Sequence, residues 1–219
     1  MTVRARSELR TWAEIAAVCG VVAVIAYSLI VAVALSLGPA LIVVCIFGPS
    51  LAAASGGLYE VLRLYRTTAS LKIGVVANVA AGVAVTMTLF AQLAFTEWVE
   101  LRFQLGAAAG SSSPAYQAAN GLQLGLDVAW DVFLSLGTFL IALNMWRHPR
   151  FGRVFATTGG VIGALVLATN LASFPEPPGD SGLIDLGPLV GLWYLTVALR
   201  IGWSLRWVEE HAAAGRRGA

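Results

Sequence analysis

Long apolar runs, interrupted by short polar or Gly- and Pro-containing segments, recur along the whole chain. These runs cover residues 12–37, 40–62, 73–97, 121–146, 154–174 and 185–207. Each has about 20 residues or more, the length that an α-helix needs to cross the hydrocarbon core of a bilayer. The pattern therefore predicts an all-α, polytopic membrane protein in which residues 1–219 form one domain, a bundle of six transmembrane helices.

Composition supports the same class. Hydrophobic residues make up 58% of the chain and charged residues only 12%, whereas about 25% of a soluble domain is charged. Six spans occupy more than half of the 219 residues, which leaves no room for a separate soluble domain. The sequence has no nucleic-acid-binding motif, so we expect no nucleic-acid partner.

The basic residues are distributed asymmetrically about these runs. When the chain is threaded back and forth through a bilayer, all but Arg102 of the 14 lysines and arginines fall on one side. Cytoplasmic loops retain such an excess, so both termini are predicted to be cytoplasmic, in a multi-pass protein of the cell membrane. Basic segments such as 147–153 are expected to contact anionic lipid head groups.

The second run contains Gly48, Pro49 and Ser50 near its middle. Proline removes a backbone donor and clashes with the carbonyl group four residues earlier, so a kink is predicted. The alternative is a broken helix whose free backbone groups bind a substrate or an ion. In membrane helices, neighbouring side chains and water usually form hydrogen bonds with the backbone carbonyl group that a proline leaves free. A kinked but continuous helix is therefore favoured.

Four polar residues at the start of the fourth run, Asn120, Gln123, Asp127 and Asp131, are spaced three, four and four residues apart. This spacing places them on one helical face. Thr138 continues that face toward the middle of the membrane, and Asn78 and Gln92 lie on a similar face of the third run. Residues late in the fifth run and at the start of the sixth belong to the same outer half. The predicted outward-facing polar pocket comprises Gln92, Asn120, Gln123, Asp127, Asp131, Asn170 and Asp185.

Of these residues, Asp131 has the highest free-energy cost of burial in the membrane, because it is predicted to lie one turn inside the hydrocarbon edge. Buried charges normally face the protein interior and have partners. A proton on one carboxyl group, or a cation between Asp127 and Asp131, would relieve the repulsion between them. We therefore hypothesise that the pocket binds or transports a small polar solute or a cation. The alternative is that these groups only hydrogen-bond between helices or protrude into water.

No catalytic, cofactor-binding or metal-binding set is recognisable in the sequence. A membrane enzyme would need a nucleophile with its base, a metal-ligand set, or carboxylates on facing helices. Asp127 and Asp131 lie on one predicted helix, which is poor geometry for a catalytic pair. We therefore expect a protein that is not an enzyme and has no cofactor. A structural or regulatory membrane subunit is the alternative to a carrier.

Glycines four residues apart occur in three of the runs, as Gly121 and Gly125, Gly159 and Gly163, and Gly187 and Gly191. This spacing lets helix backbones approach closely. We expect these glycines to serve packing within one chain, and a homodimer interface is the alternative.

Three segments, residues 131–138, 147–152 and 185–188, resemble an uncharacterised bacterial family of multi-span membrane proteins, known only as a domain of unknown function. The likeness covers the last three runs. It implies a compact helical bundle in a bacterial cytoplasmic membrane and no established activity.

Overall fold

A computed structural model describes the backbone of residues 3–103, 114–179 and 181–214, and the side chains of residues 7–95, 117–179 and 181–210. All regular secondary structure in these ranges is α-helical, which confirms the all-α prediction for this part of the chain. The helices are α1 (Val3–Ala32), α2 (Leu37–Arg63), α3 (Ala69–Phe103), α5 (Pro114–Met145), α6 (Gly152–Ser173), α7 (Gly187–Trp203) and α8 (Leu205–Ala214).

Within the described residues, 5 helices are long and apolar enough to cross a membrane, namely α1, α2, α3, α5 and α6. These lengths and compositions are those of a multi-span membrane protein. Helix α7 has only 17 residues, which corresponds to a length of about 25 Å. Helices α3 and α5, with 35 and 32 residues, are about 50 Å long and exceed the thickness of a hydrocarbon core.

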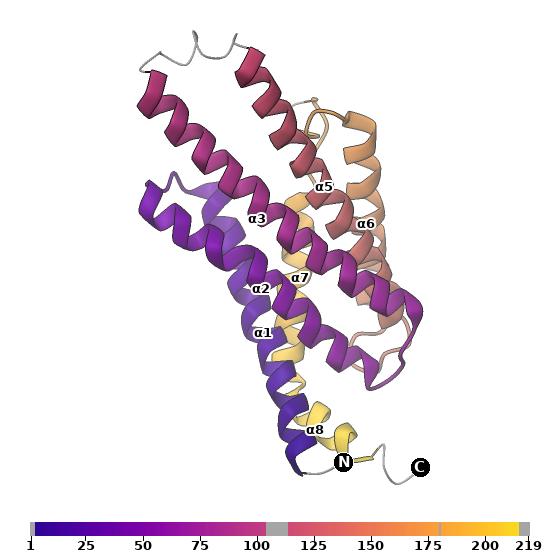
Figure 1. The fold of residues 1–219 in the computed structure, drawn as a ribbon. Coiled ribbons are helices and arrows are strands. Elements are labelled where there is room, and N and C mark those ends of the chain that lie inside the picture. Colours follow the sequence, from indigo (N-terminus) through magenta and orange to yellow (C-terminus); the bar gives the residue numbers. More distant parts are fainter. Residues whose placement is uncertain (1–2, 104–113, 180, 215–219) are drawn as a thin grey trace.

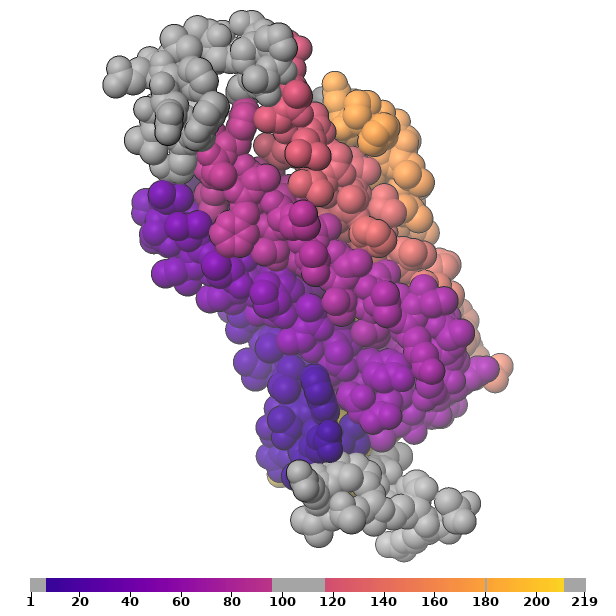
Figure 2. Space-filling view, in the orientation of Figure 1, coloured from indigo at the N-terminus to yellow at the C-terminus, as the bar shows by residue number. Residues whose placement is uncertain are grey.

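The long helices and α7 are arranged as a closed ring. Each packs against its neighbours in the sequence, from α1 through α2, α3, α5 and α6 to α7, and α7 packs in turn against α1. Helix α8 lies against the start of α1 (Figure 1). Figure 2 shows that the side chains of α2, α3 and α5 form one continuous outer face.

Charge is divided between the two ends of this ring. The start of α1, the α2–α3 and α5–α6 turns and α8 lie at one end (Figure 1). Every lysine and arginine whose side chain is described lies there: Arg10, Arg63, Arg66, Lys72, Arg147, Arg150, Arg153, Arg200 and Arg206. We call this the basic end. The opposite end, reached by the α6–α7 loop, is called the acidic end because it carries Asp127, Asp131, Glu176 and Asp185.

Two helix boundaries differ from the expected ones at glycine and proline. Helix α1 ends at Ala32 and α2 begins at Leu37, so Gly38 and Pro39 open the second helix. Proline fits there because the first turn has no hydrogen bond for it to remove. Helix α2 then continues through Pro49 without interruption, so the alternative of a broken helix is not observed.

The last expected run is divided in two. Helix α7 ends at Trp203, and the Ser204 N–H donates to Ile201 O over 2.8 Å, so the chain turns before α8 begins. Trp207 and Val208 of α8 are buried, whereas Arg206 and Glu210 are exposed. This amphipathic pattern places α8 along the side of the bundle rather than in line with α7.

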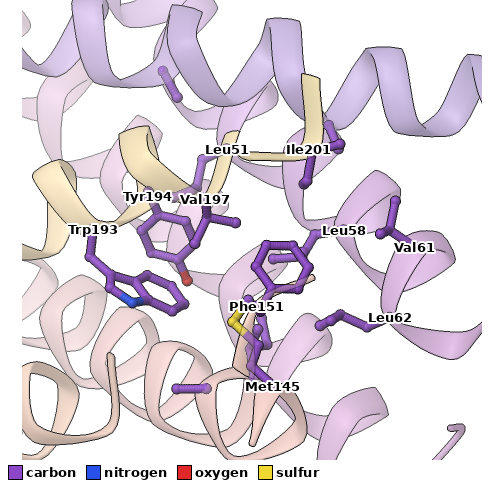
Figure 3. Close-up of a cluster of buried hydrophobic side chains, with 14 of the residues drawn as sticks. Leu51, Leu58, Val61, Leu62, Met145, Phe151, Trp193, Tyr194, Val197 and Ile201 are labelled. Carbon is purple, nitrogen blue, oxygen red and sulfur yellow. The ribbon is translucent and has the colours of Figure 1, made fainter. Parts of the chain in front are cut away.

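Large apolar side chains and close helix contacts fill the interior. Figure 3 shows Leu51 and Leu58 of α2 facing Tyr194 and Val197 of α7. At Gly159, an added Cβ would lie 2.5 Å from the Trp193 ring, so this glycine is needed for α6 and α7 to pack.

The predicted glycine contacts are only partly observed within the chain. An added Cβ at Gly163 would lie 2.9 Å from Ser135 O, and one at Gly191 would lie 3.7 Å from the Tyr27 ring. At Gly121 and Gly125 an added Cβ would meet nothing within 4 Å. Packing within one chain therefore accounts for the glycines of α6 and α7 but not for those of α5.

Candidate functional site

The acidic end brings carboxyl groups from two segments together. Asp127 and Asp131 lie one turn apart on α5, and Asp185 immediately precedes α7. The Asp131 carboxyl group is hydrogen-bonded to the Asn170 side chain and lies within electrostatic reach of both other carboxyl groups. We call Asp127, Asp131, Asp185, Asn170 and Tyr27 the acidic cluster.

Local structure positions these groups. Asp185 Oδ1 accepts a hydrogen bond of 2.8 Å from the Gly187 N–H, so this carboxyl group is held at the start of α7. Asn170 is only 3% exposed, and its Nδ2 also donates to Val166 O over 3.0 Å. These contacts fix the α6 and α7 sides of the cluster before any ligand binds.

Tyr27 of α1 joins the cluster from the opposite side of the ring. A Cβ added at Gly187 would lie 3.1 Å from Asp185 Oδ1 and 3.2 Å from the Tyr27 hydroxyl oxygen, so these two oxygens are neighbours. All three carboxyl groups act electrostatically on the Tyr27 hydroxyl group. The spacing of polar residues does not indicate Tyr27, although it is the only aromatic residue between Trp12 and Phe47.

The described basic side chains lie at the other end of the ring from the acidic cluster. Asp127 and Asp131 are half-buried and Asp185 is exposed. Among the described side chains, ion pairs join Arg10 to Glu14 and Glu209, and Arg63 to Glu60, all at the basic end. No described lysine or arginine forms an ion pair with Asp131 or Asp185.

An apolar cavity of about 40 Å³ lies beneath the cluster, between α1, α2, α5 and α7. Tyr27 and Gly187 belong to both the cluster and the cavity wall. The Phe47 ring lies 6.0 Å from that of Tyr27 and 5.8 Å from that of Trp130, measured between centroids. The remaining wall residues are Gly20, Ala23, Val24, Leu51, Ala54, Leu134, Val190, Gly191 and Tyr194.

A buried polar network lies at the deep end of this cavity. Asn78 Nδ2 donates to Tyr194 Oη over 2.6 Å and to Ser55 Oγ over 3.2 Å. Tyr194 Oη lies 3.1 Å from Thr138 Oγ1, which itself donates to Leu134 O. Helices α2, α3, α5 and α7 are thereby linked in the centre of the ring.

Asn78 Oδ1 has no hydrogen-bond partner among the described residues. It occupies the space that a Cβ on Gly137 would need. A weak contact with the Gly137 Cα–H is the interaction that this geometry permits.

The structure does not bring every predicted pocket residue to the cluster. Gln92 lines a separate groove of about 190 Å³ between α1, α2 and α3 toward the acidic end, together with Ile30 and Val44. Asn120 and Gln123 are half-buried on α5, one to two turns before Asp127. Of the other predicted residues, Asn170 hydrogen-bonds to the Asp131 side chain, and Asp127 and Asp185 lie within electrostatic reach of it.

Comparisons of the chain with protein-family models, with curated proteins and with solved structures found no match.

Proposed function

We propose that the protein is a six-span protein of the cell membrane that binds a small monovalent cation at the acidic cluster and carries it across the bilayer. The observation that supports this most directly is that Asp131 lies beside Asn170 and within electrostatic reach of Asp185, without a basic partner among the described side chains. A bound cation would balance that charge.

The ligand chemistry favours a monovalent cation over a metal ion of higher charge. In the described part of the chain, no three His, Cys, Asp or Glu side chains are arranged to hold a metal ion. The cluster also offers only carboxylate, amide and phenol oxygens as ligands, whereas transition metals prefer nitrogen and sulfur ligands.

Transport, rather than binding alone, is supported by the cavities below the cluster. A second cavity of about 10 Å³ shares Gly20, Ala54 and Tyr194 with the larger one and extends to Ile201, toward the basic end. A space of this size is just large enough for one water molecule.

The sixth crossing is supported by the place of α7 in the ring. Its 17 residues are at the short end of the range for a transmembrane helix, and α1 and α6 flank it. No charged residue occurs from Gly187 to Leu199. With six crossings, the basic end with both termini is cytoplasmic by the positive-inside rule, and the acidic cluster faces outward.

The test of binding uses the purified full-length protein in lipid nanodiscs and ammonium chloride as the probe. A ligand that binds only the folded state raises the melting temperature with concentration. We expect ammonium to raise the melting temperature of the wild type and to leave that of Asp131→Asn unchanged. Glu176→Gln, an equivalent change at an exposed loop position, is the control and should behave like the wild type.

The test of transport uses the same proteins in sealed vesicles, with methylammonium uptake as the signal. Wild type and Glu176→Gln should take up the cation faster than empty vesicles, and Asp131→Asn should not. If no monovalent cation stabilises the wild type and uptake never exceeds that of empty vesicles, the proposed function is wrong.

A further inference from the structure

The cavity beneath the acidic cluster is apolar, and an apolar cavity does not favour the binding of an inorganic cation. Its wall is almost entirely hydrocarbon, with Tyr27 at the end near the cluster and Tyr194 at the deep end. A hydrated inorganic ion gains nothing from such a wall, because burying it there removes its water without replacing it. An apolar group gains free energy in the same space.

Aromatic rings are concentrated at the boundary between charge and hydrocarbon. Tyr27, Phe47 and Trp130 form a chain of ring contacts with centroid distances of 6.0 and 5.8 Å. Ring faces attract cations, and they do so best for organic ammonium ions that shed water easily. The carboxyl groups and the aromatic rings therefore both favour an organic ammonium group.

We infer that the cation is an organic ammonium ion whose charged head lies at Asp131 and Asp185 and whose short apolar tail fills the cavity between α1, α2, α5 and α7. This inference rests on the proposed function and specifies its substrate class. The head meets carboxylates that have no basic partner among the described side chains, and the tail passes Tyr27 and Gly187, which border both regions.

The cavity limits the length of the tail. A volume of about 40 Å³ corresponds to about three water-sized groups, since each needs about 10–15 Å³ on this scale. A chain of roughly three or four carbon atoms is therefore the tail that fits without displacing α7. Longer tails should gain nothing further.

The wild-type protein in nanodiscs provides the first test, by calorimetric titration with ammonium, ethylammonium, n-butylammonium and n-octylammonium. Burial of each methylene group should tighten binding by about fourfold. We expect the dissociation constant of n-butylammonium to be at least about tenfold below that of ammonium, with no further gain for n-octylammonium. Neutral n-butanol, which has the tail without the charge, should bind far more weakly than n-butylammonium.

A cavity-filling variant provides the second test. Gly191 lines the cavity, and a Cβ there would make ordinary contact with the Tyr27 ring at 3.7 Å. Gly191→Leu should remove the advantage of n-butylammonium over ammonium and retain ammonium binding. Gly160→Leu is the matched control, because an added Cβ there meets nothing within 4 Å. If Gly191→Leu does not fold, Gly191→Ala replaces it. The titrations of the wild type with ammonium ions of increasing tail length test the inference without either variant.

The outcomes separate this inference from the proposed function. If ammonium and n-butylammonium bind equally well and Asp131→Asn abolishes both, the tail site is wrong and the cation site stands. If n-butanol binds as tightly as n-butylammonium, the cavity accepts neutral solutes and the inference is also wrong. If no cation binds in an Asp131-dependent manner, both proposals are wrong.

Discussion

At the scale of single residues, Asn78 connects more of the bundle than any charged residue does. Its amide group donates to Ser55 and Tyr194, and its Oδ1 fills the space beside Gly137. In a membrane interior, such polar contacts are favourable because an unsatisfied group has no water to bind. Asn78 therefore requires a residue without a side chain at position 137.

This requirement gives a stability prediction. Gly137→Ala places a methyl group where Asn78 Oδ1 lies, so it should lower the free energy of unfolding by about 1–3 kcal/mol, as overpacked sites do. Gly160→Ala, with open space around the new Cβ, should leave stability unchanged or raise it by up to about 1 kcal/mol. Denaturant titration in bicelles measures both variants, and equal stabilities would contradict the predicted contact.

The polar face of α5 shows what spacing reveals and what it does not. Three-and-four spacing places Asp127 and Asp131 on one face, and shared depth predicts Asn170 and Asp185 near them. In the structure Asn170 and Asp185 both act on the Asp131 carboxyl group. Gln92 is predicted to lie at the same depth along the membrane normal as these residues. Depth alone does not determine where a residue lies around the ring of helices. Spacing along one helix carries no information about which helix lies next to it. The pattern therefore does not identify Tyr27, and it does not indicate that Gln92 lines a groove with residues of α1 and α2.

At the scale of helices, α8 is held mainly by apolar burial. Trp207 and Val208 are 6% and 0% exposed, and the Trp207 ring lies 5.2 Å from the His148 ring and 5.5 Å from the Arg150 guanidinium group. The ion pair between Arg10 and Glu209, 2.6 Å long, is half-exposed. Exposed ion pairs contribute little, so the ring contacts are expected to dominate.

Two variants distinguish these contributions. Trp207→Ala should lower the free energy of unfolding by about 3–5 kcal/mol, the usual cost of removing a buried large aromatic side chain. Glu209→Gln should lower it by less than about 1 kcal/mol. The same denaturant titration applies, and an equal loss in the two variants would show that α8 is held by charge instead.

Helix existence was far easier to predict than helix boundaries. Apolar length alone identifies α1, α2, α3, α5 and α6, because a span needs about 20 apolar residues whatever its neighbours are. The end of α7 at Trp203 depends on Ser204 and on the burial of Trp207 against other helices. Such tertiary contacts have no counterpart in a linear pattern, and so one continuous run was expected there.

At the scale of the whole molecule, separation of charge is the dominant feature. The described lysines and arginines lie at one end of the ring and the acidic cluster at the other (Figure 1). If the basic end is cytoplasmic, the α6–α7 loop faces the outside. Gly179 in this loop is exposed, and an added Cβ meets nothing within 4 Å.

A labelling experiment tests that orientation. In a variant with Cys19 and Cys45 replaced by alanine, Gly179→Cys should react with a membrane-impermeant thiol reagent added to intact cells. Thr67→Cys, in the exposed α2–α3 turn, should react only after the cells are opened. The reverse pattern would place the acidic cluster on the cytoplasmic side.

Heavy-atom diffraction can show whether a cation occupies the acidic cluster. Thallium(I), a monovalent ion that scatters anomalously, is diffused into crystals of the wild type and of Asp131→Asn. The account predicts one anomalous peak within coordinating distance of the Asp131 carboxylate and near Asp185, absent from the variant. A wild-type site without a peak, in which protein groups alone satisfy Asp131, would contradict it.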